Sequence, residues 1–252
     1  MGNPRPTIVG QAMKRFFVAL GGVLLLSSSA QQLDVALAPS GTPGLAYIAP
    51  HPVSIVLDGK LEDWRGVPRV TVTTGMRNPT RPEDGALTFA VAADDTFLYL
   101  LAEIADSMII AGQHGNNVWE EDSLELYVSA NRDLERSDYS RGVAQLTVAA
   151  LDLGRGIQPV RFGRNAGDVG AQSIAVLTPS GYRIEMRLPL SCIAWQIKPK
   201  SDLELGFDLQ LNNTSSANKP QETRLTWSAR PQSLTGQNAS NTPSTFGRLR
   251  FK

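Results

Sequence analysis

The sequence predicts an all-β protein built as a single antiparallel β-sandwich. About ten short segments alternate apolar and polar residues, which is the period of a strand with one buried face. Turn signals made of glycine, proline, asparagine and aspartate separate these segments, and no segment has the spacing of a long helix. A chain of roughly 200 residues can form one such sandwich. We find no internal repeat.

The first 38 residues predict a signal peptide with an N-terminal extension. Positive charge precedes an apolar run over residues 16–26, and small residues then offer cleavage after Ala30 or Ala38. The run is too short to span a bilayer comfortably, so we expect no membrane span in the mature chain. An uncleaved anchor is the alternative. We expect an exported protein, either periplasmic or extracellular.

The remaining elements follow in order. Residues 39–52 hold four prolines and predict a linker or an extended edge segment before a sandwich over residues 53–252. Trp64 reads as a plug that covers the end of a sheet, and Asp94-Asp95 forms the turn of a hairpin. The predicted strands are residues 53–57, 70–74, 86–92, 96–105, 123–128, 143–148, 174–177, 182–188, 203–212, 224–228 and 246–251.

Composition excludes several functions. The formal net charge is zero, which argues against nucleic acid as a partner because nucleic-acid-binding proteins usually carry a basic surface. The single cysteine, Cys192, excludes an internal disulfide and a cysteine metal cluster. Two histidines make a histidine-rich zinc site improbable. No nucleophile motif, phosphate loop or zinc-protease motif is present.

One stretch, residues 117–128, combines a tryptophan with a carboxylate. Trp119 precedes an alternating strand whose polar side, including Glu125, we expect to be exposed. A flat ring stacks on the apolar face of a sugar, and a carboxylate accepts hydrogen bonds from its hydroxyl groups. A half-buried core role for Trp119 and a salt bridge from Glu125 to an arginine are the alternatives. A second polar stripe holds Asp208, Gln210 and Asn212, which periodicity places on a solvated outer face.

Other candidate groups are less specific. Asp94, Asp95 and Asp122 are weak calcium candidates, because hard oxygen ligands suit calcium, although adjacent acids in a loop are more often solvated. Met108 and Met186 are possible haem ligands, although methionine within a strand is usually core. We assign no certain cofactor.

Seven motifs occur in order along residues 53–252. They are Leu57-Asp-Gly-Lys-Leu-Glu-Asp-Trp64, Asp94-Asp-Thr-Phe-Leu-Tyr-Leu100, Val118-Trp-Glu-Glu-Asp-Ser-Leu-Glu-Leu-Tyr127, Gly181-Tyr-Arg-Ile-Glu-Met-Arg-Leu-Pro189, Gly206-Phe-Asp-Leu-Gln-Leu-Asn212, Leu225-Thr-Trp227 and Phe246-Gly-Arg-Leu249. Together they resemble the family 9 carbohydrate-binding modules, which belong to a wider sugar- and haem-binding sandwich group. The resemblance implies an immunoglobulin-like or jelly-roll-type sandwich that binds glycans without catalysis, often beside glycoside hydrolases.

The resemblance also implies site residues. Trp119 matches the first of two tryptophans that enclose a sugar, and Glu125 matches a hydrogen-bonding glutamate. Gln145 and Asn238 are further polar contacts. The second tryptophan is expected near Ser240, where residues 238–242 hold no aromatic side chain, and Thr147 replaces an expected arginine.

Three functions remain open from the sequence. The first is a secreted, non-catalytic module that binds a saccharide and supports carbohydrate catabolism, beside a separate secreted enzyme or within an envelope complex. The second is a haem-binding electron-transfer domain of the same sandwich group. The third is an accessory or catalytic protein of glycoside hydrolysis that uses Glu120, Asp122 or Glu125.

Overall fold

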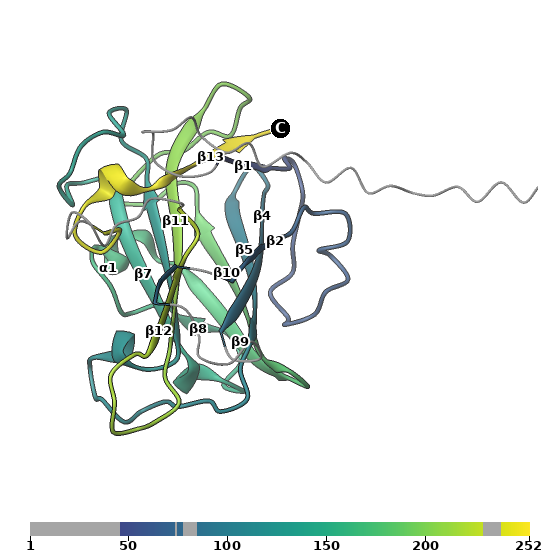
Figure 1. Ribbon diagram of the computed structural model, residues 1–252. Coiled ribbons are helices and arrows are strands. Elements are labelled where there is room, and N and C mark those ends of the chain that lie inside the picture. The colour runs from purple at the N-terminus through teal and green to yellow at the C-terminus, as the bar shows by residue number, and fades with distance from the viewer. Residues whose placement is uncertain (1–45, 74, 78–84, 229–237) are drawn as a thin grey trace, which may run out of the picture. The chain divides into compact units, whose positions relative to one another are not determined.

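The computed structural model describes residues 46–73, 75–77, 85–228 and 238–252, and it confirms the predicted β-sandwich (Figure 1). Two sheets form the layers. The seven-stranded sheet contains β1 (Ala46–Ala49), β13 (Gly247–Phe251), β11 (Glu204–Asn213), β12 (Thr223–Thr226), β3 (Gly75–Arg77), β6 (Ser123–Ser129) and β7 (Val143–Ala149). The six-stranded sheet contains β2 (Val70–Val72), β4 (Ala86–Ala93), β5 (Phe97–Ala105), β10 (Gly181–Pro189), β9 (Gln172–Thr178) and β8 (Gln158–Pro159).

The strand pairings are antiparallel among the described strands, except that β1 runs parallel to β13. Helical elements are short. They are η1 (Val118–Glu120), η2 (Ala150–Asp152), α1 (Ala166–Val169) and η4 (Pro243–Thr245). Over the described part of the chain, no helix has the length and apolarity that crossing a membrane requires. The expected signal peptide lies outside the described residues.

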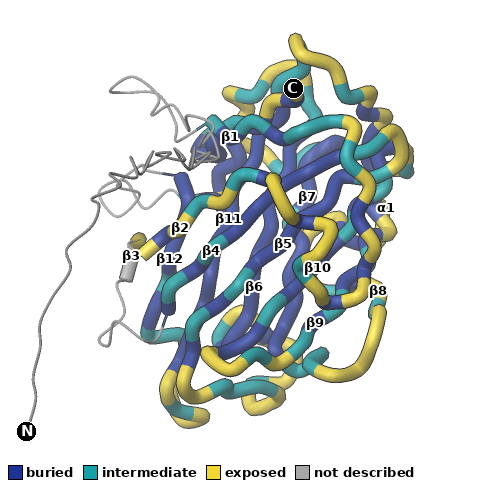
Figure 2. Tube along the Cα trace, turned by 90° about the vertical axis from the view of Figure 1, so that its right-hand side faces the viewer, coloured by how far each residue is buried: buried dark blue, intermediate teal, exposed yellow. Residues whose placement is uncertain are grey.

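The main core lies between the two sheets, and the strands are buried along most of their length (Figure 2). Leu124, Leu126 and Val128 of β6 all point into it, as their spacing predicts. Aromatic rings join the layers: Trp227 meets Phe89 of β4 at 5.6 Å and Phe207 of β11 at 5.4 Å, both nearly edge to face. Such geometry is the favourable arrangement for paired rings.

A second apolar cluster confirms that Trp64 is a buried packing residue, although it covers a face of a sheet and not the end of one. Its ring is buried against the six-stranded sheet together with Ile55 and Leu57, and its Nε1 donates a hydrogen bond to Glu185 at 3.0 Å. The strand predicted over residues 53–57 is wrong. These residues form no strand, because their apolar side chains cover a sheet face while their backbone joins no ladder.

The sandwich also begins earlier than residue 53. β1 lies within the expected linker and pairs with β13, and the His51 N–H donates to the carbonyl of Lys252 at 2.8 Å. Part of the proline-containing segment is therefore the extended edge that the sequence left as an alternative. Prolines do not prevent this, because an edge strand needs hydrogen bonds on one side only.

Candidate functional site

The polar face formed by β6, β7 and β11 is buried, not solvated. Glu125 is only 2% exposed, and Asp208, Gln210 and Asn212 are equally enclosed. The expectation of an exposed Glu125 and of a solvated polar stripe is therefore wrong. Polar side chains of three neighbouring strands bond to one another, and distant segments of the chain cover them. Hydrogen bonds within the network offset the cost of burying polar groups, although the Oδ2 atom of Asp208 has no hydrogen-bond partner among the described residues.

Glu125 is the centre of this network. Its Oε1 accepts hydrogen bonds from Asn212 Nδ2 at 2.7 Å and from Gln210 Nε2 at 3.2 Å. Its Oε2 accepts one from the Tyr127 hydroxyl at 2.5 Å and one from Gln145 Nε2. These donors fill the acceptor sites of a carboxylate. No arginine is among them, so the salt-bridge alternative for Glu125 does not hold. A ligand hydroxyl that bonds to Glu125 has to displace one of these donors.

A cavity of about 410 Å³ opens above this network. That volume is typical of a small-molecule site. Its lining residues come from the turn before β6, from β6, β7 and β12, from the loop before β12, and from two further segments, residues 162–164 and Ser240. They are Trp119, Glu125, Gln145, Thr147, Phe162, Gly163, Arg164, Gln221, Arg224 and Ser240.

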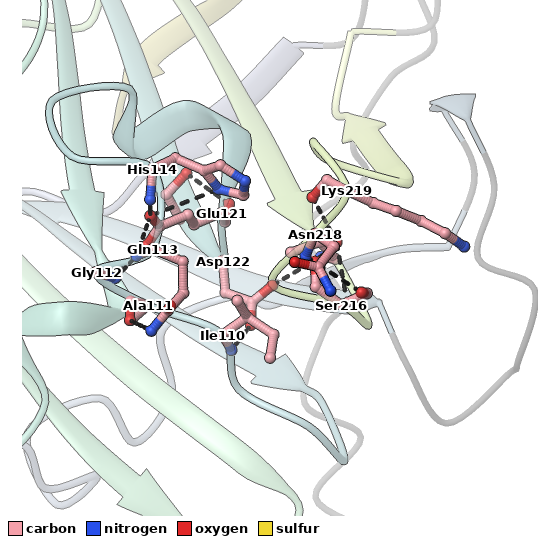
Figure 3. A network of polar contacts seen from close by, with 12 residues as sticks. Ile110, Ala111, Gly112, Gln113, His114, Glu121, Asp122, Ser216, Asn218 and Lys219 are labelled. Carbon is pink, nitrogen blue, oxygen red and sulfur yellow. Dashed lines mark hydrogen bonds and ion pairs between the residues drawn. The ribbon is translucent and has the colours of Figure 1, made fainter.

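Trp119 stands in the η1 turn, and its side chain is 44% exposed. The preceding Val118 is buried and fixes the turn to the core. Next to the turn, the buried carboxylate of Glu121 accepts backbone hydrogen bonds from Gly112, Gln113 (2.7 Å) and His114 (Figure 3). The loop before Trp119 is thereby tied to the start of β6. An exposed ring on an anchored turn loses little conformational entropy when it contacts a ligand.

Asp122, which directly precedes β6, connects the turn that carries Trp119 to two other segments. Its Oδ2 accepts the Ile110 N–H at 2.5 Å and its Oδ1 accepts the Thr214 N–H at 2.8 Å (Figure 3 shows Ile110 and Asp122). Burial, opposed by these hydrogen bonds and reinforced by the charge of Asp106, raises the pKa of Asp122 to about 8. Asp122 joins the turn that carries Trp119 to the end of β11.

Residues 162–164 form the part of the cavity wall that lies beside β7. The carbonyl of Phe162 accepts the Thr147 N–H and the carbonyl of Arg164 accepts the Gln145 N–H, both at 3.0 Å. This segment therefore pairs with the outer edge of β7. Gly163 has a φ of 114°, and a Cβ there would overlap the Gln145 carbonyl. Only glycine permits this close approach.

The structure brings three of the four predicted ligand-binding residues together. Trp119, Glu125 and Gln145 line the cavity. Asn238 is not among the lining residues. Its Oδ1 accepts a hydrogen bond from the hydroxyl of Ser240, and Ser240 does line the cavity. The ligand-binding roles of all four stay predictions.

Sequence reasoning missed Phe162, Arg164, Gln221 and Arg224. The first two lie in a glycine-rich segment with no periodicity, so no local signal placed them at the cavity. Arg224 does carry a signal: it is directly opposite Asn212 in the β11–β12 pairing, and directly opposite residues share a face.

The calcium candidates lie in different surroundings. No group of three or more histidine, cysteine, aspartate or glutamate side chains that could hold a metal ion is found within the described residues. Asp94 caps the β4–β5 turn by accepting from Thr96 N–H and Phe97 N–H at 2.7 Å and from the Tyr99 hydroxyl at 2.6 Å. Asp95 is an exposed partner of His51. Calcium binding stays a prediction, which melting in calcium against melting in chelator tests.

The haem candidates occupy different environments. Met186 is fully buried within the main core, whereas Met108 is 47% exposed. Met186 therefore has the packing role that is usual for methionine in a strand.

Comparison with known proteins adds the family. A family model described as "Carbohydrate family 9 binding domain-like" matches residues 57–252. Endo-1,4-beta-xylanase A of Thermoanaerobacterium saccharolyticum is 31% identical over 200 residues, which are 79% of this chain and 14% of that enzyme. Exoglucanase XynX of Acetivibrio thermocellus is 32% identical over 200 residues, again 79% of this chain and 16% of the enzyme. The chain thus spans about one seventh of these relatives.

Solved structures show the same fold. A carbohydrate binding module family 9 from Caldicellulosiruptor kristjanssonii in complex with glucose has a TM-score of 0.63 at 24% identity, covering 82% of this chain and 95% of that one. The complex of a module of that family and organism with cellotriose gives a TM-score of 0.61 at 23% identity, covering 82% and 93%. The resemblance noted in the sequence is confirmed.

Proposed function

Because this chain belongs to the carbohydrate family 9 binding domain-like family, we propose that it is a carbohydrate-binding module whose ligand occupies the cavity at Trp119. One observation carries the assignment: an exposed indole on an anchored turn stands at a cavity whose floor is a fixed polar network. A sugar has both apolar C–H faces and hydroxyl groups, and this cavity offers a counterpart to each.

The polar groups at the cavity have capacity for such a ligand. Gln145 uses its Nε2 to reach Glu125, and no hydrogen bond of the described residues involves its Oε1. It therefore presents an acceptor to the cavity while Glu125 holds the amide in place. Arg224 adds donors from β12, and Ser240 adds a hydroxyl. Rigid polar groups around an aromatic surface favour a polyol over an apolar ligand.

The cavity supports binding better than hydrolysis. Of the three carboxylates considered for catalysis, Asp122 is fully buried and Glu125 is bonded to four donors. The third, Glu120, is half-buried and is not among the residues that line the cavity. A general acid needs access to the glycosidic oxygen. Relatives over this region are named as a xylanase and an exoglucanase, which supports a role beside glycoside hydrolases in polysaccharide breakdown.

The test is saccharide binding by Trp119→Ala. Calorimetric titration with glucose, cellotriose and xylo-oligosaccharides measures the affinity of wild type and variant. Loss of one stacking ring is worth about 1–3 kcal/mol by analogy with base–aromatic stacking, which corresponds to a loss of roughly fivefold to more than hundredfold in affinity. Leu177→Ala, which truncates an exposed apolar side chain on the other sheet, is the control. Equal affinity of wild type and Trp119→Ala for every ligand would refute the assignment.

Export and partnership are part of the same proposal. The charged, apolar and small-residue order of residues 1–38 supports a cleaved signal and a periplasmic or extracellular protein. Fractionation of cells that express the full chain, with N-terminal sequencing of the product, tests this. A product that stays in the cytoplasm with residues 1–38 attached would contradict it. A separate glycoside hydrolase or an envelope complex is the proposed partner.

A further inference from the structure

Three charged side chains line the cavity, and they are not equivalent. Glu125 is buried and its charge is met by four donors within the protein. Arg164 is exposed and Arg224 is half-buried. Neither guanidinium has a carboxylate within ion-pair distance among the described residues, whereas Arg69, Arg183 and Arg248 elsewhere in the protein do. The charged groups that remain available to a ligand are therefore the two cationic guanidinium groups.

Arg164 is held in place by an aromatic ring. Its guanidinium lies over the Tyr139 ring, 4.8 Å from the centroid. Tyr139 is itself fixed, because its ring meets Phe246 edge to face at 6.4 Å and its hydroxyl donates to the carbonyl of Ala239. A guanidinium stacked on a ring keeps its N–H edge free for an anion. Arg164 thus presents donors to the cavity at a defined position.

Arg224 is held by two amide oxygens. One of its Nη groups donates to Gln210 Oε1 at 3.2 Å. Its Nε donates to the Gln221 side-chain oxygen at 3.2 Å when that amide is turned so that its nitrogen donates to the Trp119 carbonyl. The same amide therefore connects the arginine to the turn that carries the stacking ring. Most N–H donors of this guanidinium remain for a ligand.

We propose that the cavity selects a saccharide that carries a carboxylate, namely a uronic-acid unit, whose carboxylate pairs with Arg164 and Arg224. The inference rests on the proposed function and names the ligand class. Two fixed guanidinium groups exceed the single carboxylate, so the cavity carries net positive charge in a protein whose formal net charge is zero. Planar guanidinium groups bind carboxylates with strong, charge-assisted hydrogen bonds.

The experiment compares two ligands that differ only at one carbon. Methyl β-glucuronide carries a carboxylate where methyl β-glucoside carries a hydroxymethyl group. Titration of the wild-type protein at low salt is expected to show at least tenfold tighter binding of the glucuronide, which is about 1.4 kcal/mol. Raising the ionic strength from about 0.01 M to about 1 M should weaken the glucuronide complex and leave the glucoside complex nearly unchanged, because salt screens only the charged pair.

Variants identify the groups responsible. In Arg164→Gln and Arg224→Gln the ratio of glucuronide to glucoside affinity should fall severalfold, and in the double variant it should approach one. Arg224→Lys, which keeps the charge and loses the planar fork, should retain part of the ratio. Arg65→Gln is the matched control, because Arg65 is an exposed arginine outside the cavity. Its ratio should equal that of the wild type.

The outcomes separate the inference from the proposed function. Binding of the glucoside with no preference for the glucuronide overturns the inference and leaves carbohydrate binding intact. A preference that persists in the double variant overturns the role of the two arginines. No binding of either glycoside or of any neutral oligosaccharide overturns the proposed function and the inference with it. The salt dependence of the wild type gives a result even if a variant fails to fold.

Discussion

Replacing Asp106 by asparagine should remove the part of the pH dependence of stability that the charge of Asp106 adds to the burial of Asp122. Both residues are buried, at 5% and 0% exposure, and the charge of Asp106 contributes to the raised pKa of Asp122. Asp106 Oδ1 accepts the Met108 N–H at 2.9 Å. Asparagine keeps this acceptor and replaces the other carboxylate oxygen by an uncharged amide group. The substitution therefore removes one negative charge and keeps the shape of the side chain and its hydrogen bond from the Met108 N–H.

The sign follows from the pKa of Asp122, which burial raises first and the Asp106 charge raises further, from 3.8 to about 8. The native state binds this proton more tightly than the unfolded state does. The stability that this tightly bound proton contributes is fully present below a pH of about 4 and is lost as the pH rises through about 8. The wild-type free energy of unfolding is therefore lower at alkaline pH. The native pair then holds two negative charges in contact.

The magnitude comes from the interaction of those two charges. At a separation of about 4 Å and an effective dielectric constant of about 20, their repulsion is about 4 kcal/mol. Relaxation of the loop at residues 106–111 reduces this value. We expect Asp106→Asn to be more stable than wild type by about 2–4 kcal/mol at alkaline pH and equal to it within about 1 kcal/mol below pH of about 4.

Urea unfolding of both proteins across this pH range measures the difference. A chelator in the buffer keeps cations away from the pair. Asp95→Asn is the control, because Asp95 has an 89% exposed side chain and its substitution should shift stability by less than about 0.5 kcal/mol. Other groups with raised pKa values, such as Asp208, cancel in the comparison of wild type and variant. Stability curves that run parallel over the whole range would refute the reasoning.

Three further substitutions test other parts of the site and its scaffold. Ser240→Trp adds an aromatic ring to a cavity that Trp119 and Phe162 already line. It should raise saccharide affinity by about 1–3 kcal/mol in a calorimetric titration, and an unchanged affinity would count against stacking at this position. Gly163→Ala forces a Cβ into the Gln145 carbonyl at a φ of 114°. We expect a loss of about 1–3 kcal/mol of stability and weaker saccharide binding. A melting curve like that of the wild type would contradict the close approach of residue 163 to the Gln145 carbonyl. Glu185→Gln leaves at least one of the Asp58 N–H, Gly59 N–H or Trp64 Nε1 donors without its acceptor. A loss of about 1–3 kcal/mol of stability should appear in thermal unfolding. No loss would show that Trp64 packs without the hydrogen bonds to Glu185.

The strands were predictable because their inner faces meet an apolar core. β6, β10 and β11 show clean alternation, and the structure places their apolar residues between the sheets. The segment at residues 53–57 shows the same alternation without forming a strand. Alternation reports that one side of an extended segment is buried. It does not report whether the backbone finds a partner strand, which depends on residues far along the chain.

The same limit explains the polar face. Alternation states that the two faces of β6 differ in polarity, and solvent is the usual reason. Here Glu125 and Gln210 are both buried, and Glu125 lines a cavity whose other lining residues include 162–164 and Ser240. Nothing in the sequence of β6 signals this burial. A buried row of carboxylate and amide groups differs from a solvated row only in its partners, and those partners come from other strands.

Several residues at the cavity that the sequence analysis missed could be placed once the strand pairing is known, because strand register determines which side chains share a face. β7, β6 and β11 align Thr147, Glu125 and Gln210 as directly opposite residues. The β11–β12 pairing then sets Arg224 beside Asn212 on the same face. Once β6 is known to pair with β11, period two alone places these side chains on one surface. The pairing of those two strands, remote in sequence, is thus the one fact that turns scattered polar residues into a site.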